Sequence, residues 1–159
     1  MKRNLWLFLL KLAVTTLTLG YFWTTGWKMA YPTWIDPIAQ LFFRMFGVTQ
    51  WPLTLTADHH ASLIPFIGLL VATPGLITRW KRALVALVGG VAAIVLMHIV
   101  MSIAIFHIVD AFEMSQNAYR LLLPIYLVND AMPLILWLAF FPSVLSELFG
   151  FIKWGRHGG

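Results

Sequence analysis

Four long stretches of the chain are almost entirely apolar, and charged residues, Pro or Gly mark their ends. They cover residues 5–24, 61–78, 83–109 and 119–148. About 20 consecutive apolar residues are enough for a helix to cross the hydrocarbon core of a bilayer. The pattern therefore predicts four membrane-spanning helices. Only the basic segment TRWKR (residues 78–82) separates the second and third stretches, so these two helices should form an antiparallel hairpin.

A fifth helix is predicted between the first two spans, over residues 35–47. Its apolar residues fall on one helical stripe: Ile35, Ile38, Leu41, Phe42, Met45 and Phe46. Asp36 with Pro37 favours a helix start, and Gly47 favours a helix end. Nearby aromatic residues are typical of a belt at the headgroup level, namely Trp23, Trp27, Tyr31, Trp34 and Trp51. We expect an amphipathic helix in the outer interface, either as an anchor or as a partner-binding surface.

Proline and glycine modify the last two spans. Pro124, Pro133 and Pro142 each remove a backbone hydrogen bond, so residues 119–148 should form one bent helix or two shorter ones. Gly89 and Gly90 in the third span allow another helix to approach closely.

The composition agrees with an all-α integral membrane bundle in a single domain, residues 1–159. Hydrophobic residues make up 60% of the chain, charged residues only 11%, and the mean hydropathy is +0.83. These values are outside the usual range for water-soluble domains. Because Lys11 interrupts the first apolar stretch and no A-x-A-like site follows it, we expect a retained helix instead of a signal peptide. The absence of cysteine excludes disulfides, thiolate nucleophiles and cysteine-ligated metals.

The charges predict the orientation. The basic clusters are Lys2/Arg3, Arg79/Lys81/Arg82 and Lys153/Arg156, and the acidic residues opposite them are Asp36, Asp58, Asp110 and Glu113. Lys and Arg are retained on the cytoplasmic side, so both termini should be cytoplasmic in a bacterial inner membrane. Lys28, Arg44 and Arg120 are exceptions to this bias. Since the basic residues flank apolar stretches, the net charge of +5 does not indicate a nucleic-acid partner.

Polar residues deep in the third and fourth spans need partners. Counted at 1.5 Å per residue from the outer ends of their spans, His98 and Asp130 both lie roughly 15 Å deep. An ionisable group there costs about 2.5–3.5 kcal/mol, so we expect His98 to pair with Asp130, beside Asn129. The pair could relay protons, hold His98 as the ligand of a cofactor such as a pigment, or join two helices. A haem would need a second axial histidine on its opposite face, and His107 cannot supply it because it lies on the same helix as His98.

A second polar group is expected at the outer surface. Asp58, His59 and His60 precede the second span, and His107, Asp110 and Glu113 end the third. The predicted hairpin brings these two ends together. Imidazole and carboxylate are ordinary zinc ligands, so His59, His60, His107 and Asp110 are candidate metal ligands. A salt-bridge network with Arg120 and a solvated rim are the alternatives. The pairs Ser62/His59 and Ser102/His98 lack the glycine elbow and oxyanion loop expected of a nucleophile site.

Residues 32–142 resemble the exosortase/archaeosortase family in layout. The likeness rests on the helix ending in Gly47, the stretch SLIPFIGLLVATPGL, the basic turn RWKR and the apolar span after it. The family carries a cysteine before the basic turn, an Asn-x-x-Arg motif in the next span and a third His or Arg near the outer face. This chain reads ADHHAS at the first place and His98-Ile99-Val100-Met101 at the second, and only His107 loosely matches the third. The resemblance implies a short non-catalytic relative, or an exosortase-associated membrane protein.

We therefore expect a non-enzymatic accessory or assembly subunit of a larger membrane complex. The chain has almost no extramembrane mass and too few spans to enclose a transport pathway alone, so its partners should be lipid and either other membrane subunits or further copies of itself. One alternative is a degenerate exosortase-like or metal-dependent enzyme at the outer leaflet. The other is a pigment- or quinone-contacting subunit of an energy-converting complex.

Overall fold

The computed structural model describes residues 2–48, 60–113 and 115–149, and these residues form helices and short connections without a strand. The expected all-helical fold is confirmed there. Three helical segments are long and apolar enough to cross a membrane, judged by length and composition: Leu5–Met45, Ile77–Phe112 and Gln116–Phe140. The predicted first and third spans fall in these segments, and the predicted fourth span, residues 119–148, does so only as far as Phe140.

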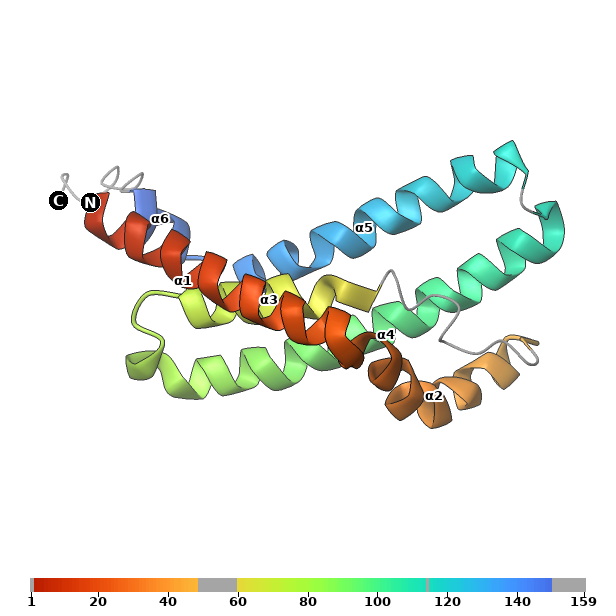
Figure 1. The fold of residues 1–159 in the computed structure, drawn as a ribbon, viewed down its shortest axis with the longest axis horizontal. Coiled ribbons are helices and arrows are strands. Elements are labelled where there is room, and N and C mark those ends of the chain that lie inside the picture. Colours follow the sequence, from red (N-terminus) through yellow and green to blue (C-terminus); the bar gives the residue numbers. More distant parts are fainter. Residues whose placement is uncertain (1, 49–59, 114, 150–159) are drawn as a thin grey trace, which may run out of the picture.

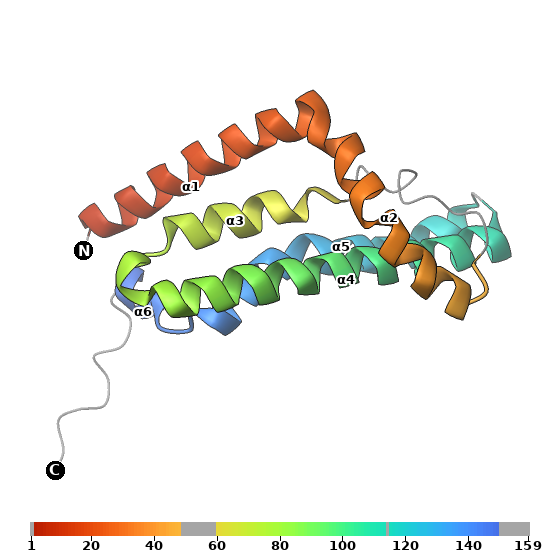
Figure 2. The same ribbon diagram turned by 90° about the horizontal axis from the view of Figure 1, so that it is seen from below.

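The first segment consists of two helices joined through a bend. Helix α1 (Lys2–Phe22) continues through a π-helical turn, η1 (Trp23–Trp27), into α2 (Lys28–Met45). Gly26 has non-helical dihedral angles within this turn, and α2 leaves it in a new direction (Figure 2). The predicted start at Asp36 and Pro37 was wrong, because α2 begins one helical turn before Pro32 and runs through both prolines. The predicted stop at Gly47 is confirmed by its left-handed φ of 70° and by the bond from the Val48 nitrogen to the Phe43 oxygen.

The second predicted span is shorter than expected. Helix α3 (Leu63–Ala72) has ten residues, about 15 Å, which is half the thickness of the hydrocarbon core. It ends because Thr73 is extended before Pro74, and Gly75 then adopts φ +64°. A crossing over residues 61–78 is therefore not confirmed. The apolar residues after Ala72 belong to a turn and to the short 3₁₀ helix η3 (Ile77–Arg79).

The third and fourth segments form a long helical hairpin. Helix α4 (Trp80–Phe112) extends beyond the predicted 83–109 at both ends. Helix α5 (Gln116–Phe140) begins after Ser115, whose hydroxyl accepts a bond from the Ala118 nitrogen. It contains Pro124 and Pro133 and ends just before Pro142, after which α6 (Val144–Phe149) follows. Of the three prolines, only the last breaks the helix.

Helices α1, α3, α4 and α5 alternate in direction along the chain (Figure 1). Helices α1 and α4 run one way and α3 and α5 the other, so the start of α1, η3 and α6 gather at one end (Figure 1). The connection between α4 and α5 lies at the opposite end, with α2 pointing toward it. A core near the first end joins the beginning and the end of the chain, and it includes Phe8, Leu70, Trp137, Phe141 and Leu148. Within it the indole of Trp137 packs on Phe8 and donates a hydrogen bond to the Thr73 hydroxyl (2.8 Å).

An ion pair links η3 to α6 at this end. Arg79 Nη2 lies 2.6 Å from Glu147 Oε1, and both side chains are about a third exposed, at 32% and 33%. Solvent screens such a pair, so we expect Glu147→Gln to lower the free energy of unfolding by no more than about 1 kcal/mol. A double-mutant cycle with Arg79→Gln, followed by thermal unfolding in detergent, measures the coupling. A coupling above about 2 kcal/mol would contradict this view of a screened pair.

Candidate functional site

His98, in the second half of α4, is a fully buried polar side chain. Its Nδ1 lies 2.7 Å from the Tyr31 hydroxyl of α2, and its Nε2 lies 2.7 Å from the hydroxyl of Ser62, which directly precedes α3. A neutral imidazole has one N–H and one acceptor nitrogen, so one hydroxyl donates to the ring and the other accepts from it. His98 therefore joins α2, α3 and α4 through side-chain hydrogen bonds.

A second histidine completes this group. The ring of His60 stacks on His98 with centroids 4.5 Å apart and planes at 22°. The Tyr31 ring is steeply inclined to both, at 75° and 88°, with centroid distances of 5.6 Å. Both histidines are 0% exposed. We call Tyr31, His60, Ser62 and His98 the polar cluster. The members of the cluster come from α2, from the residues just before α3 and from α4, so the cluster joins these three helices. Its rings and hydroxyls pack against one another and shield His98 from solvent.

The expected pair of His98 and Asp130 was wrong. The two residues do lie at the same level of the hairpin, each about 21 Å along its helix from the α4–α5 connection at 1.5 Å per residue. However, both ring nitrogens of His98 bond to hydroxyls, and Asp130 is exposed. The neighbouring Asn129 is the buried residue, because one position along a helix turns a side chain by about 100°. With its nitrogens engaged in this way, His98 is also not placed to be a cofactor ligand.

Those expected metal ligands that the structure describes, His60, His107 and Asp110, do not come together. His59 lies outside the described residues, and His60 belongs to the polar cluster. His107 is exposed about 13 Å further along α4 than His98, and its Nε2–H donates to the Phe46 carbonyl (3.1 Å). Asp110 is exposed beyond it. Among the residues that the structure describes, no three His, Asp or Glu side chains are close enough to hold a metal ion.

The serine and histidine pairing also differs from both predicted combinations. Ser62 bonds to His98, and the third member is Tyr31. A hydroxyl 2.7 Å from an imidazole matches the spacing of a nucleophile and its base, but Ser62 is only 6% exposed. Tyr31 was missed because it was assigned to the aromatic belt. Its hydroxyl was a usable signal, since a histidine deep in an apolar span requires a hydrogen-bonding partner.

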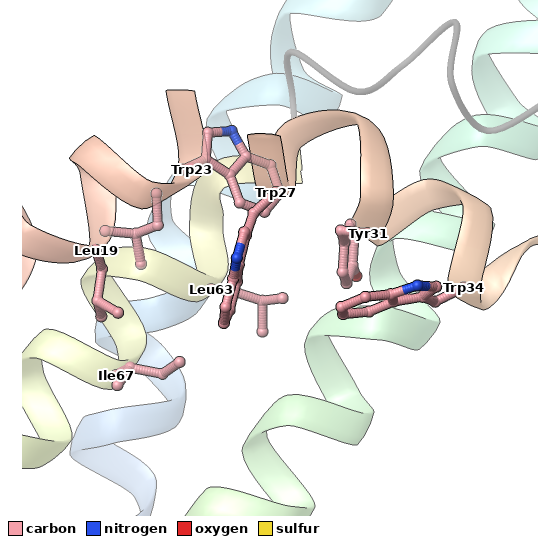
Figure 3. Close-up of a pocket in the computed structure, with 8 residues that line it drawn as sticks. Leu19, Trp23, Trp27, Tyr31, Trp34, Leu63 and Ile67 are labelled. Atoms are coloured by element: carbon pink, nitrogen blue, oxygen red, sulfur yellow. The ribbon is translucent and has the colours of Figure 1, made fainter. Parts of the chain in front are cut away.

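An apolar cavity of about 110 Å³ adjoins the polar cluster (Figure 3). The bend between α1 and α2 and the first turns of α3 line it with Leu19, Trp23, Trp27, Tyr31, Trp34, Leu63, Ile64 and Ile67. The Trp23 and Tyr31 rings lie 5.6 Å apart, and the Trp27 and Trp34 rings 6.5 Å apart. Four of the five aromatic residues assigned to the belt thus surround one cavity, and Trp51 lies outside the described residues. Tyr31 is shared, because its ring lines the cavity and its hydroxyl holds His98.

Compared with known proteins, the chain matches no family model, no curated protein and no solved structure. The layout shared with exosortases and archaeosortases therefore stays a prediction. The site itself is a closed polar cluster beside an aromatic cavity. His98 connects it to the hairpin of α4 and α5, on which Asp130 is exposed.

Proposed function

We propose that this protein is a non-enzymatic accessory or assembly subunit of a larger complex in a bacterial inner membrane, with both termini cytoplasmic. The orientation is supported by the basic turn, which lies at the same end as the start of α1 and α6 (Figure 1). The use of both His98 nitrogens within the chain favours a structural role for the polar cluster. One observation carries the proposal of a partner, and it is the position of Asp130.

Asp130 is an exposed carboxylate in the middle of an apolar helix. It lies about 15 Å from the end of α5 at Phe140, too far for a short side chain to reach the interface. Leu127 and Leu134, on the same side of the helix, are also exposed. Among the residues that the structure describes, the Asp130 carboxylate accepts one long hydrogen bond of 3.5 Å from the Asn129 amide. A charge at mid-depth in the membrane costs about 2.5–3.5 kcal/mol. This face of α5 therefore requires a hydrogen-bond donor or a cation, which lipid tails do not supply.

The matching partner is a membrane helix that presents Lys, Arg or another hydrogen-bond donor at the level of Asp130. Such helix contacts in lipid are formed by close packing and by polar side chains that bond across the interface. A partner cation would remove most of the cost of placing the carboxylate in hydrocarbon. This is the arrangement expected of a subunit that docks laterally onto another membrane protein.

Asp130→Asn should release the partner without unfolding the chain. The chain has no cysteine, so Leu134→Cys can carry a single photo-reactive benzophenone next to Asp130 in native membranes. We expect a cross-link to one other protein, reduced at least tenfold by Asp130→Asn, while thermal unfolding of the purified subunit stays unchanged. A label at Leu17→Cys on α1, where the leucine is 74% exposed, is the control and should not respond to Asp130→Asn.

Three outcomes would overturn the proposal. Cross-links to lipid alone would show that no protein covers this face of α5. Cross-links to a second copy of the chain would show a homo-oligomer in place of an accessory subunit. A cross-link that Asp130→Asn leaves unchanged would remove the carboxylate from the interface.

The aromatic cavity favours one second candidate, a subunit that contacts a hydrophobic cofactor such as a quinone. Its walls are almost wholly apolar, which suits the hydrocarbon part of such a molecule better than a polar ring. Absorption spectra and extracted lipids of the gently purified complex test this candidate. A chromophore or quinone in stoichiometric amount, lost when Ile67→Trp fills the cavity, would support it.

A further inference from the structure

A groove at the basic end of the hairpin combines positive charge with an apolar wall. It lies between the start of α4 and the end of α5 and has a volume of about 450 Å³. The lining residues are Lys81, Arg82, Val85, Ala139, Phe140 and Pro142. The groove is open to the surroundings and is separate from both the aromatic cavity and Asp130.

The two cations of this groove are not neutralised by the described part of the chain. Lys81 and Arg82 are exposed, and the first turn of α4 contains no acidic residue. The nearby carboxylate of Glu147 is already engaged by Arg79 and by the Ser143 hydroxyl, at 2.6 and 3.2 Å. Lys81 Nζ lies 5.7 Å from the centre of the Trp80 ring, and indoles favour the membrane interface. An anion at this level would therefore meet two positive charges that no carboxylate in residues 60–113 or 115–149 is shown to pair with.

The wall below the cations is apolar and continues toward the middle of the hairpin. Val85 lies one turn into α4 from Lys81 and Arg82, and Val88 follows it with 63% of its surface exposed. Phe140 forms the facing wall from α5. A free phosphate would use only the cations, whereas a molecule with an anionic head and a hydrocarbon tail would use both parts of the groove.

We propose that this groove binds one anionic phospholipid of the bilayer. Its phosphate lies between Lys81 and Arg82, and one acyl chain follows Val85 and Phe140. Charge complementarity selects the anionic headgroup, and the apolar wall holds the lipid in a fixed place instead of in a diffuse counterion layer. The proposal is independent of the partner at Asp130.

Native mass spectrometry of the full chain in detergent tests the proposal. In detergent the groove can be reached by added lipid whatever the orientation of the chain in a membrane. The protein is incubated with equal amounts of phosphatidylglycerol and phosphatidylcholine of the same chain length. We expect one retained phosphatidylglycerol per chain, in at least tenfold excess over phosphatidylcholine. Lys81→Gln with Arg82→Gln should reduce that adduct at least tenfold.

Lys11→Gln is the matched control, because Lys11 is an exposed cation in α1 outside this groove. It should leave the adduct unchanged, and unchanged helical content by circular dichroism shows that each variant is folded. Glycerophosphate, which has the anionic head without tails, should not displace the lipid at equal concentration. Equal retention of the two lipids, an equal loss with Lys11→Gln, or displacement by glycerophosphate would each overturn the proposal.

Discussion

Replacing Gly90 by alanine is expected to lower the free energy of unfolding by about 1–3 kcal/mol, as overpacking of a well-filled interior usually does. A Cβ atom at this position would overlap Cζ of Phe66 and lie 2.6 and 2.9 Å from its Cε1 and Cε2. Phe66 is 0% exposed, so its ring has no free space to enter. The substitution should push α3 away from α4, and thermal unfolding in detergent would measure the loss.

The adjacent glycine supplies the control. A Cβ atom at Gly89 would meet only Phe140 Cζ at 3.4 Å, which is an ordinary contact. Gly89→Ala should therefore be neutral or stabilise the helix by up to about 1 kcal/mol, since alanine is the better helix former. Equal effects of the two substitutions would show that α3 and α4 do not meet at Gly90.

The largest loss is expected from His98→Ala, at about 3–5 kcal/mol. The change leaves the hydroxyls of Tyr31 and Ser62 without their shared partner, and it opens a space beside His60. Tyr31→Phe and Ser62→Ala each remove one hydrogen bond while keeping most of the volume. We expect each of them to cost about 1–2 kcal/mol.

His107→Ala is the control on the same helix. Its ring is exposed and makes one hydrogen bond to a backbone carbonyl, so the expected loss is below about 1 kcal/mol. Thermal unfolding of the two variants in the same detergent compares them directly. If His98→Ala and His107→Ala cost the same, the polar cluster does not join the helices.

The lengths of the apolar stretches predicted much of the fold, but they did not predict the length of the second helix. Residues 61–78 have the composition of a crossing, yet Thr73, Pro74 and Gly75 end α3 after ten residues. Mean hydropathy is taken over the whole segment, whereas a proline restricts the backbone of the one residue that precedes it. The end of α2 at Gly47 was predictable from a single residue, because glycine accepts the left-handed conformation there.

The sequence predicted how deep the polar residues lie along their helices, but it did not predict the directions in which their side chains point. Counting residues placed His98 and Asp130 at one level, but the choice between Asn129 and Asp130 depends on a rotation of about 100° that no boundary in the sequence defines. The contact between Tyr31 and His98 depends on the bend at Gly26, which redirects α2 toward α4. The rotation has no local sequence signature, and Gly26 alone does not define the direction of the bend.

The core that joins Phe8 to Trp137 and Leu148 affects the order of biogenesis. A ribosome releases Phe8 long before residues 137–148, so the part of the core around Phe8 can close only when nearly the whole chain has emerged, although α1 can pack on α3 earlier. During that interval Phe8 lacks its contact with Trp137 and is open to chaperones or to insertion factors. Chains shortened before α6 would lack the residues that close this core, and quality-control proteases would be expected to remove them.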